Sequence, residues 1–396
     1  MPYELVASTW GQEEIDAIKR VIDTGMFTMS SHVAQFERDF AAKMGGKYAV
    51  MVNSGSSANL IGIASFFFRK KHPLQAGDEI IVPAISWSTT FTPLMQYGLK
   101  LRFVDVDLET LNLDVTLLEK ALTPRTKAVM AVSILGNPCA LDVMRAFCDR
   151  HHLILFEDNC ESMGASLGGK NCGTYGDIGT FSSFFSHHIS TMEGGVCLTD
   201  DEELYHIMLS LRAHGWTRQL PDDSPIYEKH GEDFFETYRF ILPGYNVRPL
   251  ELSGAIGIEQ LKKLDRFIQI RRANAETWVS LFRDDERFFI QKEHGVSSWF
   301  AFTLILNPAL HVDRKKILQS LKEEGIQYRI ITGGNFLRHD VIQYCDHDIV
   351  GEIVHANIAH DFGFFVGNHP KDIRREIEHF HKVIDRAASL SMNPSK

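Results

Sequence analysis

Hydrophobic and polar positions follow three successive patterns along the chain. Two amphipathic stretches with helical spacing come first, Glu13–Ile22 and Val33–Met44, with a break at Gly25. From Lys47 onward, short apolar runs alternate with helical segments. The runs are predicted to be buried strands over Tyr48–Val52, Glu79–Val82, Leu101–Val104, Ala128–Val132 and Leu153–Phe156, and the segments to be helices over Ser57–Phe68, Thr90–Tyr97, Val115–Leu122 and Leu141–Arg150. This alternation predicts an α/β fold, with right-handed crossovers and a mostly parallel sheet covered by helices on both faces.

The third pattern follows a predicted helix, Asp201–Arg212, and a polar loop, Gln219–Glu232. A long helix is predicted over Ile256–Phe282, followed by an aromatic strand over Trp299–Leu306 and a helix over Asp313–Glu324. A further strand over Ile326–Ile331 and a C-terminal helix complete this part. This succession predicts a smaller α+β domain. We therefore expect N-terminal helices over 1–45, packed with the small domain or at an interface, a large domain over 46–255 and a small domain over 256–396.

Composition narrows the function classes. Among 396 residues, 44% are hydrophobic and 23% are charged, as in ordinary globular proteins. The net charge of -10 argues against a nucleic-acid partner or an anionic membrane, but not against one phosphorylated small molecule. The N-terminus lacks a signal-peptide pattern, and the apolar run Ile61–Phe68 is too short to span a bilayer. Six scattered cysteines without a C-x-x-C pair predict no metal site and a cytoplasmic location.

Polar motifs follow the predicted strands, where open parallel sheets bind their ligands. Asn53–Ala58 comes directly after a strand and opens a helix, and it contains Gly55, Ser56 and Ser57. Glycine allows close approach of the backbone, and the exposed amides of a helix start suit a phosphate. An ordinary capped turn between strand and helix is the alternative. Asp158 likewise ends a buried strand and requires a cation, supplied either by a ligand or by a basic side chain.

The stretch Gly179–Gly195 runs from an aromatic, serine-rich strand through two histidines to a Glu-Gly-Gly turn. It resembles the active-site strand of the DegT/StrS family of pyridoxal-phosphate (PLP) nucleotide-sugar aminotransferases, in which a lysine lies six residues before this glutamate. Counting back from Glu193 gives His187, and no lysine occurs between Lys170 and Lys229. Only this count favours His187 over His188. An imidazole cannot form an imine, but it transfers protons near neutral pH.

The resemblance covers nearly the whole chain. It implies an aspartate-aminotransferase-like fold (PLP fold type I) and a homodimer with shared active sites. It assigns Ser56, Ser57 and Ser182 to the cofactor phosphate, Trp87 to stacking on the pyridine ring, and Asp158 to the ring nitrogen. Glu161 stands near the ring hydroxyl, where the family commonly has glutamine.

Two segments are expected to reach the neighbouring subunit's site. Arg212–Arg218 and Gly244–Pro249 resemble family segments with that role. They imply that Asn246 contacts the phosphate, and that His214, Arg218 and Arg248 contact substrate. Arg329 is a further candidate for substrate binding. Solvated surface residues are the ordinary alternative for each arginine.

One branch of the family carries histidine in place of lysine and removes the 3-hydroxyl of GDP-4-keto-6-deoxy-D-mannose, on the route to colitose. The motifs Glu-Asp-Asn-Cys-Glu-Ser-Met-Gly-Ala and Leu-Pro-Gly-Tyr-Asn-Val-Arg-Pro are most similar to that branch. It uses L-glutamate to convert the cofactor to pyridoxamine phosphate. An iron-sulfur branch with a reductase is disfavoured, because residues 214–220 contain no cysteine. An ordinary aminotransferase and a non-catalytic PLP-binding module remain as alternatives.

Overall fold

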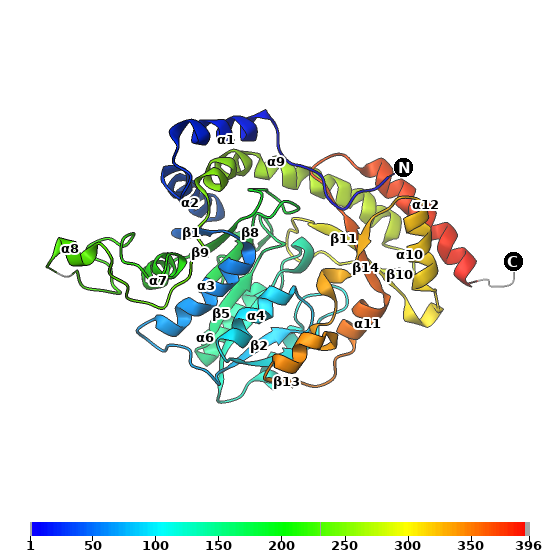
Figure 1. The fold of residues 1–396 in the computed structure, drawn as a ribbon. Coiled ribbons are helices and arrows are strands. Elements are labelled where there is room, and N and C mark those ends of the chain that lie inside the picture. Colours follow the sequence, from blue (N-terminus) through cyan, green and yellow to red (C-terminus); the bar gives the residue numbers. More distant parts are fainter. Residues whose placement is uncertain (1, 230, 393–396) are drawn as a thin grey trace.

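Two sheets organise the chain in the computed structural model, which describes residues 2–229 and 231–392 (Figure 1). The strands are β1 (Tyr48–Val52), β2 (Glu79–Pro83), β3 (Lys100–Val104), β4 (Thr126–Val132), β5 (Ile154–Asp158), β6 (Ser166–Leu167), β7 (Lys170–Asn171), β8 (Ile178–Ser182), β9 (Gly195–Thr199), β10 (Phe288–Phe289), β11 (Ala301–Leu306), β12 (Tyr328–Arg329), β13 (His347–Ile349) and β14 (Gly363–Gly367). The α-helices are α1 (Gln12–Thr24), α2 (Ser31–Met44), α3 (Gly55–Phe68), α4 (Ser88–Gln96), α5 (Leu118–Ala121), α6 (Leu141–His151), α7 (Glu202–Arg212), α8 (Asp233–Glu236), α9 (Glu251–Phe282), α10 (Arg314–Glu323), α11 (His355–Phe362) and α12 (Arg374–Met392).

The large sheet has the order β1-β9-β8-β5-β4-β2-β3-β13. Strands β8, β5, β4, β2, β3 and β13 run parallel, whereas β9 is antiparallel to both of its neighbours. The prediction of a mostly parallel sheet with helices is therefore confirmed. The carboxyl ends of β4, β5 and β8 lie next to one another, which brings the loops that follow them to one edge.

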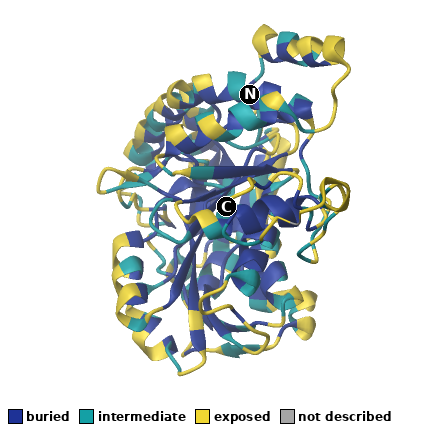
Figure 2. Ribbon diagram, turned by 90° about the vertical axis from the view of Figure 1, so that its left-hand side faces the viewer, coloured by how far each residue is buried: buried dark blue, intermediate teal, exposed yellow. Residues whose placement is uncertain are grey.

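Alternating side chains of the large sheet enter two different cores. On β1, Val50 and Val52 belong to the cluster that α3, α4 and α7 cover, and Ala49 and Met51 to the cluster under α2 and α9. Helices α5 and α6 cover the latter face farther along the sheet. Figure 2 shows the buried strands between helices whose outer faces are exposed. Burial on both faces explains why the strands are continuous apolar runs.

The small domain is an antiparallel sheet, β10-β11-β14-β12, packed against helices. Trp278 and Phe282 of α9 lie in one core with Phe302 of β11 and Phe380 of α12. The opposite face of β11, with Ala301 and Ile305, joins the core of the large domain. This contact places the small sheet beside the carboxyl edge of the large one.

Some predicted elements differ from those observed. The predicted strand Ile326–Ile331 is reduced to Tyr328–Arg329, because the chain then enters a short 3-10 turn, Ile331–Gly333. Helix α9 begins at Glu251, five residues before its predicted start, and no described helix has the length and apolar character of a membrane span. Strand β13 was not predicted: it returns from the small domain and pairs with β3.

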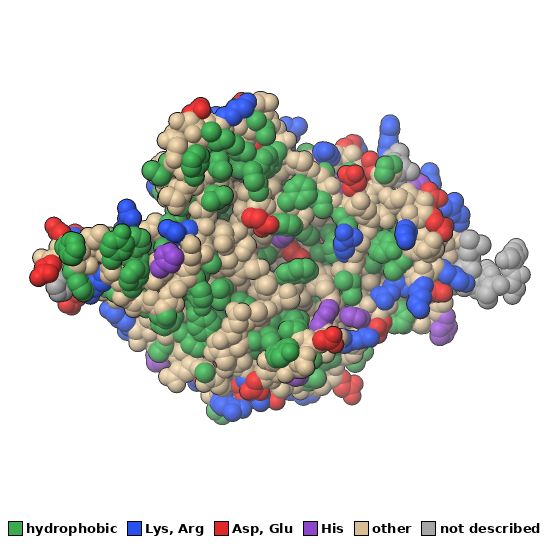
Figure 3. All heavy atoms as spheres, in the orientation of Figure 1, with side chains coloured by type: hydrophobic (Ala, Val, Ile, Leu, Met, Phe, Trp, Pro, Cys, Tyr) green, Lys and Arg blue, Asp and Glu red, His purple; other side chains and the backbone are tan. Residues whose placement is uncertain are grey.

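An arm around α8 extends from the large domain (Figure 1). Phe234, Phe235, Tyr238 and Phe240 on this arm are exposed. Figure 3 shows hydrophobic side chains gathered on the arm and at the end of the molecule formed by α1 and α2. Met26 and Phe27 are exposed in the link between these two helices. The chain thus leaves two apolar surfaces open.

Candidate active site

A cavity of about 360 Å³ opens at the carboxyl edge of the large sheet. Segments after β1, β2, β4, β5 and β8 line it, and Phe300, Thr332 and Phe365 of the small domain complete its wall. The sequence motifs predicted at strand ends therefore meet in one place. Among the predicted site residues, those lining the cavity are Gly55, Ser56, Trp87, Asp158, Glu161, Ser182 and His187.

Asp158 ends β5 and is buried at the cavity wall. Its Oδ2 accepts hydrogen bonds from Thr90 Oγ1 at 2.7 Å and Asn59 Nδ2 at 2.9 Å, and its Oδ1 accepts one from the Cys160 amide at 3.1 Å. No Lys, Arg or His among the described residues forms an ion pair with it. A buried carboxylate without a cation is costly. A ligand carrying a protonated ring nitrogen fits this carboxylate.

The start of α3 at the cavity has backbone amides that suit an anion. Ser54 caps the helix by accepting the Ser57 amide, and the first amides of a helix have no carbonyl partner within it. A Cβ built on Gly55 would lie 2.7 Å from Ser182 Cβ and 3.0 Å from Cys160 Sγ. Glycine is therefore required for the close packing of these three segments. Ser56 lies here with its Oγ 2.8 Å from Thr89 Oγ1.

Ser57 and Trp87 occupy different positions relative to the cavity. Ser57 donates its hydroxyl to Asn53 Oδ1 at 2.6 Å and does not line the cavity, so its side chain stabilises the turn. Trp87 precedes α4 and keeps 59% of its surface exposed at the cavity. A large aromatic side chain left open beside a ligand cavity offers a flat face for stacking.

His187 lies on the loop between β8 and β9, and its Nδ1 is 2.6 Å from the Cys160 carbonyl oxygen. Because a carbonyl only accepts, Nδ1 carries the hydrogen and Nε2 keeps its lone pair. Phe184 and Phe300 pack edge-on against the ring, with centroids at 5.9 and 5.1 Å. Burial lowers the pKa of His187 to about 4, and the cation of Arg271 adds to this. The imidazole is therefore a neutral base at pH 7.

His188 points away from this cavity. It is fully buried, its Nε2 lies 3.2 Å from the Ser298 carbonyl oxygen, and its Nδ1 has no hydrogen-bond partner in the described part of the chain. It does not line the cavity. Burial lowers its pKa well below the ordinary value, so this ring is a neutral packing residue.

Glu161 adds a second titratable group to the cavity. Its Oε2 accepts hydrogen bonds from the Leu135 amide at 2.9 Å and from Thr332 Oγ1 at 3.3 Å. Burial raises the pKa of Glu161 to about 7, and the nearby charge of Asp158 contributes to the rise. This carboxyl holds a proton at a pH at which ordinary glutamates are ionised.

Residues predicted to serve a neighbouring subunit lie outside the cavity of their own chain. Asn246 forms a bridge with Ala213 at the base of the arm, and it accepts a hydrogen bond from Arg248 Nε at 3.0 Å. The amide of Asn53 donates to the Val247 carbonyl at 3.0 Å, so the segment at the foot of the arm adjoins the turn that precedes α3. Asn246 and Arg248 are thus placed near, but not within, the cavity.

Three further predicted residues also lie outside the cavity. His214 has a left-handed backbone with φ of 64°, and the Arg218 guanidinium stacks over Trp216 at 5.1 Å on the arm. Arg329 lies on β12, is exposed, and donates to its neighbour's carbonyl. A role for these residues in binding substrate stays a prediction, which for His214 and Arg218 concerns the site of a second subunit.

Several site residues carried no sequence signal. Asn59 and Thr90 hold Asp158, yet each lies inside a helix pattern without a motif of its own. Phe300 and Thr332 come from the small domain, far along the chain, and only the packing of the two sheets brings them to the cavity. No group of three or more His, Cys, Asp or Glu among the described residues has the arrangement of a metal site.

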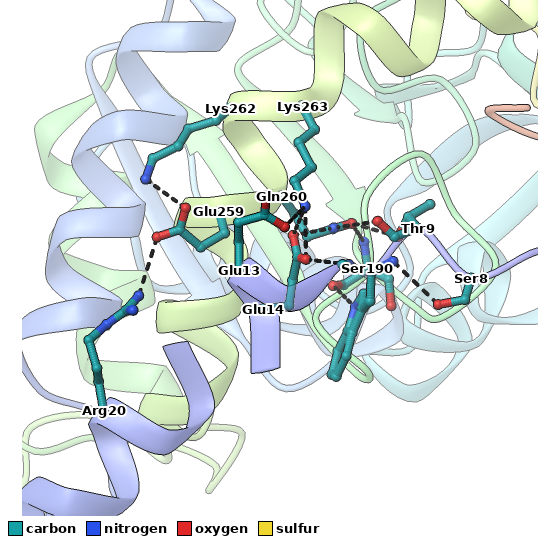
Figure 4. A network of polar contacts seen from close by, with 12 residues as sticks. Ser8, Thr9, Glu13, Glu14, Arg20, Ser190, Glu259, Gln260, Lys262 and Lys263 are labelled. Atoms are coloured by element: carbon teal, nitrogen blue, oxygen red, sulfur yellow. Dashed lines mark hydrogen bonds and ion pairs between the residues drawn. The ribbon is translucent and has the colours of Figure 1, made fainter. Parts of the chain in front are cut away.

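A polar network supports the loop that carries His187 (Figure 4). The buried Gln260 of α9 accepts the Ser190 amide at 3.0 Å and Thr9 Oγ1 at 2.7 Å, and it donates to Glu14 Oε1 at 2.8 Å. Lys263 binds both oxygens of Glu14 at 2.8 Å. Burial alone would raise the pKa of Glu14, but these bonds outweigh it and the pKa is lowered. The network joins α1, α9 and the active-site loop.

We expect Gln260→Leu to lower the free energy of unfolding by about 2–4 kcal/mol, because buried donors and acceptors on three segments lose their partner. Urea unfolding followed by circular dichroism measures the change. Lys262→Met is the matched control on the same helix, since its exposed pair with Glu259 should contribute less than about 1 kcal/mol. Equal midpoints for the Gln260 variant and the parent chain would contradict this assignment.

The fold and the cavity define a PLP-type aminotransferase scaffold, and the chain belongs to the DegT/DnrJ/EryC1/StrS aminotransferase family, whose pattern matches residues 8–371. It is 52% identical to the GDP-4-keto-6-deoxy-D-mannose 3-dehydratase of Yersinia pseudotuberculosis, over 97% of this chain and 98% of that one. The E. coli GDP-4-keto-6-deoxy-D-mannose-3-dehydratase with bound hydrated PLP matches with a TM-score of 0.95 and 51% identity, over 97% of this chain and 99% of that chain. A structure of GDP-4-keto-6-deoxymannose-3-dehydratase with a trapped PLP-glutamate geminal diamine matches equally, with a TM-score of 0.95, 51% identity and coverage of 96% and 100%.

Proposed function

We propose that this chain is a PLP- and glutamate-dependent 3-dehydratase of a 4-keto-6-deoxy nucleotide sugar, namely GDP-4-keto-6-deoxy-D-mannose. Similarity over nearly the full length to enzymes of that name supports the substrate and the reaction. The observation that carries the proposal is His187, a neutral imidazole on the cavity wall. Its distance of six residues from Glu193 matches the position of the lysine in the family that the chain resembles.

A solved variant of a relative, GDP-4-keto-6-deoxymannose-3-dehydratase, also supports His187. In that variant a serine and the histidine that follows it are replaced by asparagine and lysine. Ser186–His187 is the serine–histidine pair on the loop between β8 and β9, and both residues line the cavity. His188, in contrast, follows another histidine and lies outside the cavity.

The residues of the cavity fit the cofactor. Asp158 would hold the ring nitrogen, Trp87 the ring face, and Gly55, Ser56 and Ser182 the phosphate, since each lines the cavity at a strand end or helix start. Pyridoxal phosphate, when bound, supplies an electron sink for carbanions formed next to its nitrogen. Asp158 stabilises the positive charge on which that sink depends. Because no lysine is found among the described residues of the cavity wall, these non-covalent contacts would retain the cofactor.

His187 moves protons in both halves of the reaction. Its Nε2 has a lone pair, while Nδ1–H donates to the Cys160 carbonyl and fixes the ring. In the first half it takes the α-proton of glutamate, whose amino group stays on the enzyme while 2-oxoglutarate leaves. In the second half it takes the proton whose loss expels the 3-hydroxyl of the sugar. A lysine could reprotonate the sugar and give an amino sugar, whereas an imidazole leaves elimination and hydrolysis open.

We further propose that the chain works as a homodimer with shared sites in the cytoplasm. The exposed apolar surfaces of the arm and of the link between α1 and α2 suit a partner subunit. Asn246, Arg248, His214 and Arg218 lie on the arm or its base and would complete the site of a second copy. The six cysteines, all within the described residues, form no disulfide, which suits a reducing compartment.

Incubation with PLP, L-glutamate and GDP-4-keto-6-deoxymannose tests the proposal. We expect formation of 2-oxoglutarate, release of ammonia and a sugar product that has lost the 3-hydroxyl, all measured by mass spectrometry and enzymatic assay. Accumulation of an amino sugar would identify an aminotransferase instead. Binding of PLP without conversion of glutamate would identify a binding module, and dependence on bound iron and a reductase would identify the iron-sulfur branch.

A further inference from the structure

The carboxyl of Glu161 is held from both domains. The Leu135 amide comes from the 3-10 turn after β4, Ile134–Gly136, and the Thr332 hydroxyl from the turn Ile331–Gly333 of the small domain. Both groups donate to the same oxygen, Oε2, at 2.9 and 3.3 Å. One carboxyl oxygen thus connects the two sheets across the cavity.

Both residues that hold Glu161 have strained backbones. Leu135 has a φ of 53° and Thr332 a φ of 41°, in the left-handed region that residues with a Cβ rarely adopt. Threonine is β-branched, so its strain is the more unusual of the two. Strain of this kind persists where the surroundings enforce it, and it concentrates at functional sites. Two strained segments that converge on one oxygen indicate that the position of Glu161 matters to function.

This geometry determines where Glu161 can carry a proton. Oε2 already accepts two hydrogen bonds, so a proton on the carboxyl resides on Oε1. Oε1 forms no hydrogen bond with the described residues, and Glu161 lines the cavity. A glutamine here would accept the same two bonds and present an NH₂ group. It would be a permanent donor that cannot release a proton.

Glu161 and His187 are in complementary states at the same pH. The pKa of Glu161 is raised to about 7 and that of His187 is lowered to about 4. Between these values the carboxyl is protonated and the imidazole is neutral. The remaining titratable groups on the described cavity wall are Asp158, Cys160 and Glu193, and burial keeps the Cys160 thiol neutral by raising its pKa. Opposite shifts of two groups that line one cavity are the usual arrangement of an acid and a base.

We infer that Glu161 is the acid partner of His187 in the sugar half of the reaction, giving its Oε1 proton to the departing 3-hydroxyl. This inference rests on the proposed function. Loss of water requires a proton taken from carbon and a proton given to oxygen. His187 Nε2 takes the first, the electron pair of that C–H bond moves into a new double bond, and the C–O pair leaves with oxygen. Glu161 converts this oxygen to water, so His187 need not deliver the proton it has just received.

The roles of Glu161 and His187 can be distinguished by measuring the glutamate and sugar half-reactions separately. Glutamate conversion expels no hydroxyl, so Glu161→Gln should slow loss of the sugar hydroxyl by about a hundredfold and should slow glutamate conversion at least about tenfold less than that. The amide oxygen of the introduced glutamine can accept the same two hydrogen bonds, from the Leu135 amide and the Thr332 hydroxyl, and the side chain has nearly the same shape as glutamate. Equal losses in both halves, or an undiminished sugar half, would overturn the inference.

A pH profile provides a test that a structural role would not affect. In the parent chain, the rate of the sugar half-reaction should decline as pH rises through about 7, because Glu161 loses its proton. The Glu161→Gln variant should lack this declining limb of the pH–rate profile. Thr332→Val removes a hydrogen bond that lowers the pKa of Glu161, so its limb should move to higher pH. Unchanged limbs in both variants would overturn the inference.

Infrared spectra of the cofactor-free protein give a readout independent of turnover. At pH 6 the parent chain should show a protonated carboxyl band that Glu161→Gln lacks, and the absence of that band would overturn the inference. If glutamate is converted by the parent chain but the sugar is not dehydrated, the proposed function fails instead. The infrared result for Glu161 then still stands.

Discussion

Replacing His187 with asparagine should lower the conversion of glutamate to 2-oxoglutarate by at least about a thousandfold, because general acid–base catalysis contributes up to about ten-thousandfold. Asparagine has a similar size but no titratable nitrogen. Its side chain can still donate to the Cys160 carbonyl, which now faces His187 Nδ1. The variant should therefore fold and bind cofactor normally. Single-turnover absorbance changes with glutamate measure the loss, and equilibrium dialysis measures the binding.

His188→Asn is the matched control for this experiment. It changes the adjacent histidine, which is buried against the Ser298 carbonyl and does not line the cavity. We expect a lower melting temperature with a rate within about threefold of the parent chain, since only packing is altered. Normal turnover in the His187 variant, or a mass increase from PLP attached to a side-chain amine of the parent chain, would refute the assigned mechanism.

Replacing Asp158 with asparagine should slow glutamate conversion by roughly a hundred- to a few thousandfold, because loss of one partner of a buried charge pair costs about 3–5 kcal/mol. Asparagine fills the same space but offers no negative charge to a ring nitrogen. Its oxygen can keep the bond from Thr90, which now lies at 2.7 Å from Oδ2. The absorbance of bound cofactor as a function of pH checks the cause, since the ring nitrogen should lose its proton at lower pH in the variant.

Thr90→Val tests the environment of Asp158 without removing its charge. The change deletes one hydrogen bond to the carboxylate, which also receives bonds from Asn59 and the Cys160 amide. We expect an intermediate effect of about tenfold, as for one lost hydrogen bond to a charged group. An Asp158→Asn variant with the parent rate and spectrum would show that the carboxylate does not pair with the cofactor.

The sequence predicted the large domain well because its strands are buried on both faces. Runs such as Tyr48–Val52 are apolar without interruption, and alternation with helices allows few other folds. Prediction failed where tertiary contacts, rather than the local sequence, determine the secondary structure. The chain near Ile331 turns sharply to bring Thr332 to Glu161, and β13 has three residues with no apolar run, so neither was evident from the pattern.

For the candidate site, position along strands was more informative than residue type. Asp158, Ser182 and His187 reach one cavity because the strands preceding them are neighbours in the sheet. Ser57 was assigned to the phosphate by resemblance; its hydroxyl donates to Asn53 in the described structure, and the assignment stays a prediction. Contacts of Asn59, Phe300 and Thr332 arise from sequence-distant packing. The predicted roles of Asn246, Arg248, His214 and Arg218 involve a second copy of the chain, and the role of Arg329 in substrate binding also stays a prediction.

The position of β13 in the sequence affects how the large sheet can form during synthesis on the ribosome. Three residues from the last quarter of the chain, His347–Ile349, complete the large sheet at β3. Until they emerge, the amide and carbonyl groups along that side of β3 have no strand to pair with, and an open edge of this kind invites another nascent chain. A chain truncated before residue 347 should therefore expose an unpaired edge at β3 and be prone to aggregation, rather than form an independent large domain.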